Sequence, residues 1–360
     1  MLILLKGLAA CTSESGRTGL LQEPANPGMY TMMLASQRSR IETLFPEGTH
    51  RSMKPGRQEF PVSATVAVSA LWFHSDGTYG AKAIQAAMDS GAQVVVVPAL
   101  PGPWLLDTTI TLRSNLELII EEGCLLKAVP GAFMGTGETI LEGNGVQNLH
   151  ISGYGASIIM RKADYQQAPY KASQWRHGLS LRGTRNIQVR GLTISSSGGD
   201  GVYLGTLPSE DGRFRIPCQD TVLADLILSD HHRQGISVIS AERLLIERCV
   251  ITGTRGHLPS AGIDFEPNSR DPGFTDCVVR DCIISGNAGP GILVALGRLS
   301  KDSSPLSITL ENNEVKGQAI AFSLFGTLRY HHGEIRFRNN IFSGFHLTRP
   351  RGNIRLVFKP

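Results

Sequence analysis

The sequence lacks long hydrophobic runs, and its apolar stretches are as short as Val94–Val97. A helix that spans a membrane needs about 20 consecutive, mainly apolar residues, so the sequence predicts no such span. Charged residues are also scarce at 18%, and aromatic residues at 6%. Hydrophobic residues nevertheless make up 41% of the 360 residues. That share suffices for a sizeable core and excludes a chain that is disordered throughout.

Cysteine is sparse, and no two cysteines form a Cys-x-x-Cys pair. The spacing therefore indicates neither a zinc site nor a thioredoxin-like site, and six cysteines are too few for a disulfide scaffold in a chain of this length. The formal net charge is +4, without a block of Lys and Arg. This charge suits an anionic partner but gives no sign of nucleic-acid binding. The cysteines are Cys11, Cys124, Cys218, Cys249, Cys277 and Cys282.

The amino-terminal segment carries a possible export signal. Leu8-Ala9-Ala10-Cys11 resembles a bacterial lipobox, although the apolar part before it is short and is interrupted by Lys6. On this basis we expect an exported protein, in the periplasm, on the cell surface or outside the cell. Residues 12–60 mix Ser, Pro, Gly and charge without sustained periodicity, which is typical of a linker. We therefore expect a leader or poorly ordered linker over residues 1–60 and one folded domain over 61–360.

The folded part begins with a short amphipathic helix over residues 81–90. Ile84, Ala87 and Met88 fall on one face of that helix, and Gly91 ends it. A buried strand follows over residues 93–97 and ends at Pro98. The rest of the chain reads as short strands separated by Gly, Asn or Pro, with no further long helix.

From about residue 140 the chain repeats one pattern of six positions. An apolar residue comes first, followed by two mainly polar residues. The fourth position is Leu, Cys or Asn, the fifth is any residue, and the sixth is apolar. A second short strand follows most of these units, and successive second strands start 27 to 34 residues apart. A fixed period of this size with several short strands per repeat predicts a solenoid. Because the repeats contain strands only, we expect an all-β parallel β-helix. The six units span residues 189–194, 223–228, 246–251, 279–284, 310–315 and 337–342.

The fourth position of the unit predicts an interior column of stacked side chains. Cys249 and Cys282 occupy positions that Leu fills in other repeats, and this favours small apolar fillers over a disulfide or reactive thiols. Asn313 and Asn340 predict an amide ladder in the last coils. The helix over residues 81–90 would cap the amino-terminal end and block edge-to-edge aggregation. The column consists of Leu192, Leu226, Cys249, Cys282, Asn313 and Asn340.

The entry to this repeat resembles that of the pectin-lyase-like right-handed β-helix superfamily. The resemblance rests on Asp76-Gly77, Ala83–Ala87, Gly91-Ala92, Val95–Pro98 and the segment from Asn115 to Leu125, and it covers roughly residues 68–360. It implies a saccharide-active or saccharide-binding protein, since the superfamily includes polygalacturonase-type hydrolases, pectate and alginate lyases, mannuronan epimerases and phage tailspikes.

The signatures of individual subfamilies are mostly missing. The polygalacturonase set of Asn-Thr-Asp, Gly-Asp-Asp, Gly-His-Gly and Arg-Ile-Lys is represented only by Gly198-Gly199-Asp200-Gly201. The Asp-Pro-His of alginate epimerases has its nearest counterpart in Asp230-His231-His232. No single mechanism is therefore transferred from the resemblance.

Asp264 and Glu266 form the first candidate catalytic pair. Side chains alternate between the two faces of a strand, so if Ile263 and Phe265 point inward, both carboxylates point outward, with Cα atoms about 7 Å apart. Paired carboxylates suit glycoside hydrolysis, in which one protonates the leaving oxygen and the other attacks or activates water. The same pair would suit a cation such as Ca²⁺ that neutralises an acidic sugar, although nothing in the sequence requires a cofactor.

Two neighbouring repeats add polar residues that we expect in the same groove, because stacked coils lie about 4.8 Å apart. His231 and His232 are candidate acid–base groups and Asp200 a candidate assisting carboxylate. A turn role for Asp200 and a plain surface role for the histidines remain alternatives. The candidate substrate-binding residues are Arg233, Gln234, Tyr203, His177, Trp175 and Asn268.

Three functions remain open at this point. The first is hydrolysis of a glycosidic bond in a polysaccharide, with Asp264 and Glu266 as the catalytic pair. The second is a lyase or C5-epimerase acting on a uronate polymer, in which His231 or His232, together with Tyr203, moves the C5 proton while Arg233 or a bound cation neutralises the carboxylate. The third is a glycan-binding protein without catalysis. In each case the expected partner is a polysaccharide, anionic in the second, and neither nucleic acid nor a membrane.

Overall fold

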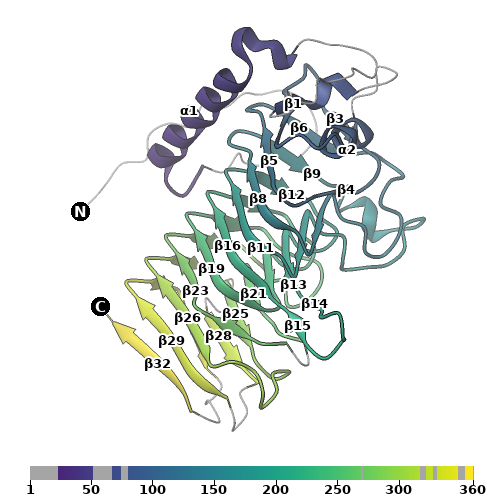
Figure 1. The fold of residues 1–360 in the computed structure, drawn as a ribbon. Helices are drawn as coiled ribbons and strands as arrows, with labels where there is room; N and C mark the ends of the chain where they lie inside the picture. The colour runs from purple at the N-terminus through teal and green to yellow at the C-terminus, as the bar shows by residue number, and fades with distance from the viewer. Residues whose placement is uncertain are drawn as a thin grey trace, which may run out of the picture.

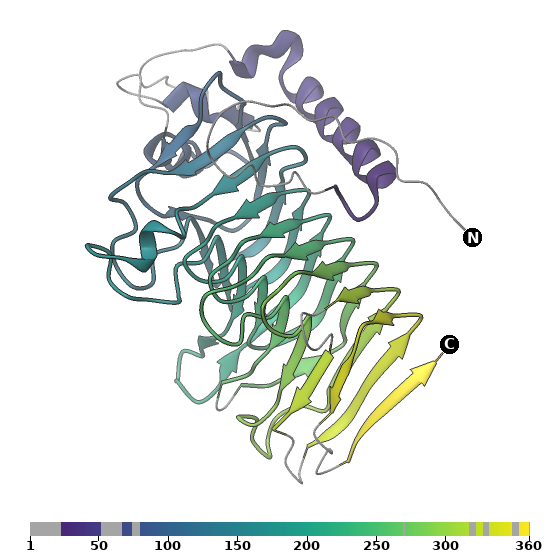
Figure 2. The same cartoon turned by 180° about the vertical axis from the view of Figure 1, so that it is seen from behind.

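The computed structural model describes residues 23–51, 67–73, 80–268, 271–316, 322–326, 331–347 and 353–359. Leu8–Cys11 and Asp76-Gly77, on which parts of the sequence analysis depend, lie outside these ranges. Figures 1 and 2 show short strands stacked in successive coils from the amino-terminal to the carboxyl-terminal end.

The coils form three parallel sheets along the stack, which we call A, B and C. Sheet A contains β1 (Ala67–Ser69), β2 (Val94–Val97), β5 (Leu116–Ile120), β8 (Gln147–Ser152), β11 (Arg185–Arg190), β16 (Cys218–Ala224), β19 (Ala241–Glu247), β22 (Phe274–Thr275), β23 (Cys277–Arg280), β26 (Leu306–Glu311), β29 (His332–Arg338) and β32 (Asn353–Lys359). Sheet B contains β3 (Trp104–Leu106), β6 (Leu125–Ala128), β9 (Ser157–Ile159), β12 (Thr193–Ser195), β17 (Ile227–Ser229), β20 (Val250–Thr252), β24 (Ile283–Ser285), β27 (Glu314–Lys316) and β30 (Ile341–Phe342). Sheet C contains β4 (Ile110–Thr111), β7 (Leu141–Asn144), β10 (Leu179–Arg182), β13 (Val202–Gly205), β18 (Ile236–Val238), β21 (Ile263–Phe265), β25 (Ile292–Ala295), β28 (Phe322–Phe325) and β31 (Phe345–Leu347). The fold is therefore the predicted parallel β-helix.

The turn from sheet A to sheet B explains the repeated sequence unit. In each of the last five coils that make this turn, one residue with positive φ follows the sheet A strand, the column residue comes next, and the sheet B strand begins. Asn and Asp tolerate this backbone better than other non-glycine residues, and four of the five are Asp or Asn. The fifth, Arg248, is held by two hydrogen bonds to Asp225 of 2.7 and 3.0 Å. The five are Asp225, Arg248, Asp281, Asn312 and Asn339.

The predicted interior column is confirmed. The Cys249 backbone N–H lies 3.5 Å from the Cys282 sulfur, and the Cys282 N–H donates to Asn313 Oδ1 at 3.1 Å. Asn313 in turn donates from its side chain to Asn340 Oδ1 at 2.9 Å. Leu192 and both column cysteines are buried in the core. The amide ladder thus satisfies polar groups inside the last coils, where an unpaired group would be costly.

The expected linker over residues 12–60 is wrong for helix α1 (Pro27–Leu44). Asn26 caps this helix by accepting from the Met29 N–H at 3.0 Å, and Pro27 takes the first position, where its missing N–H costs nothing. Sequence periodicity missed the helix because few of its residues are buried and one of them is an amide. Its buried residues are Gln37 and Ile41.

Helix α2 (Ala81–Asp89) confirms the predicted amphipathic helix. Its buried face of Ile84, Ala87 and Met88 joins the main core at the amino-terminal end of the stack (Figure 1). The smaller elements are the antiparallel hairpin of β14 (Leu207–Pro208) and β15 (Arg215–Ile216) and the 3₁₀ helices η1 (Pro46–Arg51), η2 (Ala70–Phe73) and η3 (Asp164–Gln166).

Candidate functional site

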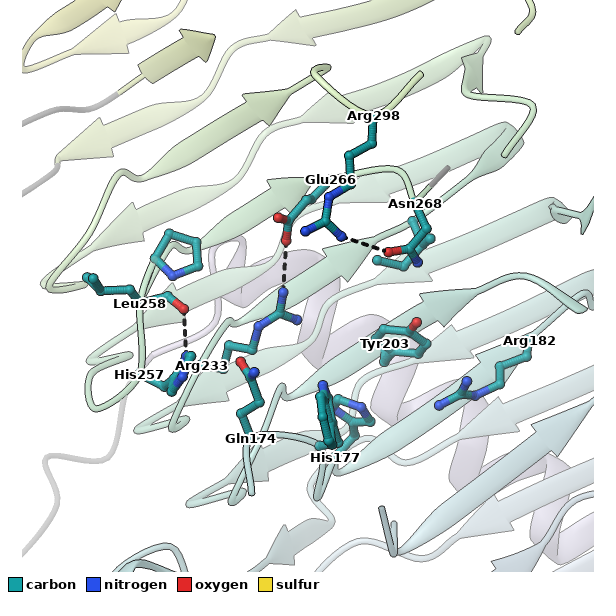
Figure 3. A pocket seen from close by; sticks show the side chains of 13 residues that line it. Gln174, His177, Arg182, Tyr203, Arg233, His257, Leu258, Glu266, Asn268 and Arg298 are labelled. Carbon is teal, nitrogen blue, oxygen red and sulfur yellow. Dashed lines mark hydrogen bonds and ion pairs between the residues drawn. The ribbon is translucent and has the colours of Figure 1, made fainter. Parts of the chain in front are cut away.

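A cleft of about 550 Å³ lies on the outer face of sheet C, and we call it the Arg233 cleft. Two loops wall it, one leading into β10 and the other between β20 and β21. It brings together six of the predicted site residues, and Figure 3 shows most of its side chains converging. The six are Trp175, His177, Tyr203, Arg233, Glu266 and Asn268.

Strand register places the outward column of sheet C as the sequence predicted. Tyr203 pairs with Ser237, and Ser237 pairs with Asp264, on three consecutive coils. Ile263 and Phe265 belong to the core, as the alternation requires. The expected exposure of Asp264 is wrong, because its side chain is completely buried although it faces away from the core. Side chains from the turn before β18 cover it.

Arg233 is the centre of this covering layer. Its Nη2 donates to Glu266 Oε2 at 2.8 Å, and its Nη1 lies 3.4 Å from both Asp200 Oδ2 and Ser237 Oγ. Burial alone would lower the pKa of Arg233, but the charges of Asp200, Glu266 and Asp264 outweigh it and raise that pKa. The guanidinium is therefore a permanent positive charge among three carboxyl groups.

Asp264 is held below Arg233 by Gln234. The Gln234 amide donates to Asp264 Oδ2 at 2.7 Å and accepts from the Ala261 N–H at 2.8 Å. Burial raises the pKa of Asp264 well above its ordinary value, and the neighbouring Glu266 charge adds to this, while Arg233 opposes it. Gln234 is fully buried. The expectation that it binds substrate is therefore wrong, because both ends of its amide are used to position Asp264.

His177 lines the cleft on the side of the earlier coils, and the fully buried Asp200 contacts its ring. Burial raises the pKa of Asp200 to about 6, with Arg233 opposing the rise. The Asp200 backbone N–H donates to His177 Nδ1 at 3.0 Å, which leaves the ring proton on Nε2. Burial, and then the charges of Arg182 and Arg233, lower the pKa of His177 well below its ordinary value. His177 is thus a neutral donor whose Nε2 has no hydrogen-bond partner among the described residues.

A stacked column of rings and guanidinium completes this wall. The rings of His177 and Tyr203 stack at 4.7 Å between centroids with an angle of 12°. The Arg182 guanidinium lies 4.7 Å from the centre of the Tyr203 ring, within reach of a cation–π interaction. Sequence reasoning missed Arg182, although its outward position follows from the alternation of Leu179 and Leu181 into the core.

Arg298 and His257 also line the cleft and were not predicted. Arg298 Nη1 lies 3.3 Å from Asn268 Oδ1 on the neighbouring loop. Both residues belong to irregular segments, where no periodicity indicates the direction of a side chain. Their place in the cleft depends on the path of the loops.

The expectation that His231 and His232 share the groove with Asp264 and Glu266 is wrong. His231 is fully buried, its Nδ1 lies 2.8 Å from Ser197 Oγ, and burial lowers its pKa to about 3. His232 lines a neighbouring cleft instead, beside His257. Both histidines lie in the turn after β17, where the chain changes direction and successive side chains diverge.

A cation site at Asp264 and Glu266 does not fit the structure. The Arg233 guanidinium already pairs with Glu266 and adds its charge to the surroundings of Asp264. Within the described ranges, no three His, Cys, Asp or Glu side chains gather as metal ligands would. None of the described helices is both long and apolar enough to cross a membrane.

Comparison with known proteins supports the fold. A model described as "Right handed beta helix region" matches residues 170–346. Protein YclG of Bacillus subtilis (strain 168), which is described as uncharacterized, is 23% identical over 202 residues, or 51% of this chain and 34% of that one. The chain spans about a third of the length of the curated relatives it matches.

Two solved structures share the fold over most of the chain. A tailspike protein mutant of Escherichia coli bacteriophage HK620 has a TM-score of 0.59 at 17% identity, and covers 90% of this chain and 62% of its own. An iota-carrageenase complexed to iota-carrageenan fragments has a TM-score of 0.52 at 13% identity, and covers 76% and 58%. Together with the matched model and the parallel coils, they show the fold of a right-handed parallel β-helix.

Proposed function

We propose that this protein hydrolyses a glycosidic bond of a polysaccharide bound in the Arg233 cleft. The observation that carries the proposal is the set of three carboxyl groups around Arg233, of which only Glu266 lines the cleft. Burial and neighbouring charge give Asp200 and Asp264 raised pKa values beside it. Glycosidases commonly catalyse hydrolysis with a pair of carboxyl groups whose surroundings give them different pKa values.

In this mechanism the buried Asp264, whose pKa is raised, holds one proton. Glu266 is the catalytic residue, because its side chain reaches the cleft, and Asp264 is a positioning residue that stores the proton beneath it. The proton passes to the leaving oxygen as the bond from that oxygen to the anomeric carbon breaks. A water molecule gives its hydroxyl to the anomeric carbon and its proton back to the pair, so the enzyme returns to its initial state.

We further propose that the sugar at this position is acidic. Three arginines line the Arg233 cleft against a single carboxylate, Glu266. In the part of the chain that the structure describes, neither Arg182 nor Arg298 is ion-paired with a carboxylate, so both are available to a ligand. Guanidinium groups match carboxylate and sulfate oxygens. A polysaccharide substrate also accords with the export that Leu8–Cys11 suggests.

One observation favours a second candidate, a lyase or C5-epimerase. Neutral His177 stacks on Tyr203 opposite Arg233, and the pair resembles what is needed to move a C5 proton while arginine neutralises a uronate. Elimination and epimerisation both begin with abstraction of the C5 proton, but only elimination leaves an unsaturated sugar that absorbs ultraviolet light. A lyase and a hydrolase are therefore distinguished by their products.

The test is an assay of the full chain on neutral, uronate-containing and sulfated polysaccharides, reading reducing ends and ultraviolet absorbance together. Hydrolysis predicts new reducing ends without absorbance. Glu266→Gln should lower kcat about 10²- to 10⁴-fold, as expected for the loss of a general acid–base group. Glu242→Gln on sheet A is the matched control, since its side chain is 29% exposed against 30% for Glu266.

Other outcomes decide between the alternatives. Reducing ends accompanied by absorbance would replace hydrolysis with elimination. Glycan binding by the wild type, without turnover of any polysaccharide that it binds, would leave a binding protein and contradict the proposal. Unchanged turnover in Glu266→Gln would remove Glu266 from the mechanism.

A further inference from the structure

A second cleft, of about 640 Å³, adjoins the Arg233 cleft, and we call it the Tyr170 cleft. Gln174, Trp175 and His257 line both clefts, so the two clefts lie side by side. The walls of the Tyr170 cleft come from the segment between β9 and β10 and from the loop between β20 and β21. A chain molecule bound at Glu266 would therefore extend past Trp175 into this second cleft.

The chemistry of the Tyr170 cleft differs from that of its neighbour. Among the described residues that line it, none is Asp, Glu, Lys or Arg, whereas the Arg233 cleft has three arginines and a glutamate. Its lining consists of tyrosine, tryptophan and histidine rings, glutamine amides, one serine and three small residues, Ala168, Ala172 and Gly256. Burial lowers the pKa of His232 in its wall to about 4, so this imidazole is uncharged at neutral pH. The cleft thus offers hydrogen bonds and apolar rings but no fixed charge.

Trp175 stands on the boundary of the two clefts with 51% of its surface exposed. Of the three tryptophans of the chain, Trp104 is fully buried and Trp72 half-buried, so Trp175 is the exposed one. A large exposed ring beside a groove offers a flat apolar surface to a ligand. Tyr170 presents a second, half-buried ring further along. Such rings accept the apolar C–H face of a sugar, while amides serve its hydroxyls.

The wall that carries these rings is held in place by a buried arginine. Arg176 is fully buried, and its guanidinium donates to the carbonyl oxygens of Phe133 at 2.8 Å and Lys171 at 2.5 Å. The same guanidinium lies 5.2 Å from the centre of the Tyr165 ring in the cleft wall. The Tyr170 hydroxyl accepts the Gly131 N–H at 2.7 Å. The cleft is therefore built before a ligand arrives, which lowers the entropic cost of binding.

We infer that the Tyr170 cleft is a subsite for an uncharged sugar of the same polysaccharide whose acidic sugar lies in the Arg233 cleft. This inference rests on the proposed function and extends it, because it assigns the substrate to heteropolysaccharides that contain both neutral and acidic residues. Trp175 stacks on the sugar at the boundary, and Tyr170 together with Gln174 binds the uncharged unit.

The experiment measures binding to full-length Glu266→Gln protein, so that turnover does not consume the ligand. The probes are neutral gluco-, manno-, galacto- and xylo-oligosaccharides of two to six units, and fluorescence of Trp175 reports their binding. The blocking variant is Ala172→Trp, because Ala172 is exposed and lines only the Tyr170 cleft of the two. The matched control is Ala163→Trp, an exposed alanine on the same segment that lines neither cleft.

We expect at least one neutral oligosaccharide to bind, with an affinity at least 10-fold weaker in Ala172→Trp and unchanged in Ala163→Trp. Trp175→Phe should abolish the fluorescence change, while calorimetry still detects binding. Failure of all neutral probes to bind, or equal affinity in the blocking and control variants, would overturn the inference.

The test of the neutral subsite and the test of the proposed hydrolysis can be distinguished from each other. If wild type and Ala172→Trp cleave an acidic polysaccharide with the same kcat/KM, hydrolysis is retained and the neutral subsite is contradicted. Wild-type protein that binds neutral oligosaccharides but cleaves no polysaccharide would retain the subsite and lose hydrolysis.

Discussion

Arg233 Nη2 and Glu266 Oε2 are 2.8 Å apart, although 33 residues separate them in the chain (Figure 3). Arg233 precedes β18 and Glu266 follows β21, so the ion pair joins two neighbouring coils directly at the cleft. Because the Arg233 side chain is only 13% exposed, little water screens the pair. The ion pair fixes Glu266, the one carboxylate that lines the cleft, and Arg233 also balances the charge of the neighbouring Asp200 and Asp264.

Removing Arg233 should destabilise the protein strongly. Arg233→Met leaves Asp200, Asp264 and Glu266 without their cation, and breaking one side of a buried ion pair costs about 3–5 kcal/mol. Arg243→Met is the control, because Arg243 is 51% exposed and solvent screens its pair with Asp220. Urea denaturation at pH 7 measures both. Equal losses in the two variants would contradict a special role for Arg233.

The carboxyl group of Asp200 should make the protein less stable as the pH rises from about 4 to 6. Its pKa of about 6 exceeds the ordinary value of 3.8, so in this window the folded state binds more protons than the unfolded state. The free energy of unfolding then falls by up to about 3 kcal/mol as the group ionises. Asp200→Asn lacks this contribution.

Denaturant titrations of wild type and Asp200→Asn at pH 4, 5, 6 and 7 isolate the effect, because all other groups titrate in both proteins. The variant should gain stability relative to wild type as the pH rises. Stability curves that stay parallel over this range would show that Asp200 does not titrate there.

Burial of His231 should make the protein less stable as the pH falls, which is the opposite of the effect of Asp200. Its folded pKa of about 3 lies below the ordinary 6.5, so the unfolded state binds the extra proton when the pH falls below 6.5. At pH 4.5 this amounts to a loss of about 3 kcal/mol relative to pH 7. His231→Asn should flatten the acid side of the stability curve by about that amount. His150→Asn, at an exposed position of β8, is the control, and an identical curve for both variants would refute the assignment.

Gln37 should hold α1 on the β-helix. Its amide donates to the carbonyl oxygens of Ile120 and Tyr154 at 3.2 Å each, and accepts from Ser152 Oγ at 2.6 Å and the Tyr154 N–H at 3.1 Å. Gln37→Ala leaves these buried groups unpaired, at about 1–3 kcal/mol per group lost. We expect proteolysis near α1 to accelerate at least 10-fold.

Arg38→Ala is the control for Gln37, because the Arg38 side chain is 57% exposed in its pair with Glu122. This variant should change proteolysis near α1 by less than about 3-fold, in line with the small worth of surface pairs. Comparable acceleration in both variants would mean that helix contact in general, and not the Gln37 amide, holds α1.

Much of the architecture could be predicted from the repeat and from the alternation of residues along the strands. The interior column from Leu192 to Asn340 was visible because stacked coils repeat one environment, and the alternation around Ile263 and Phe265 gave the direction of Asp264. The same reasoning missed helix α1, because its two buried residues, Gln37 and Ile41, combine an amide with an aliphatic side chain and leave no apolar period. The Asn26-Pro27 pair was the one local signal for it.

The repeating strands, the turns that join them and the face on which each strand residue lies follow from short-range backbone preference and period, so they could be predicted from the sequence. Which outward residues meet depends on the folded chain. It covered Asp264 with Arg233 and Gln234, buried His231, and moved His232 into the neighbouring cleft. Loops set those positions, and the path of a loop depends on long-range packing that no local pattern encodes.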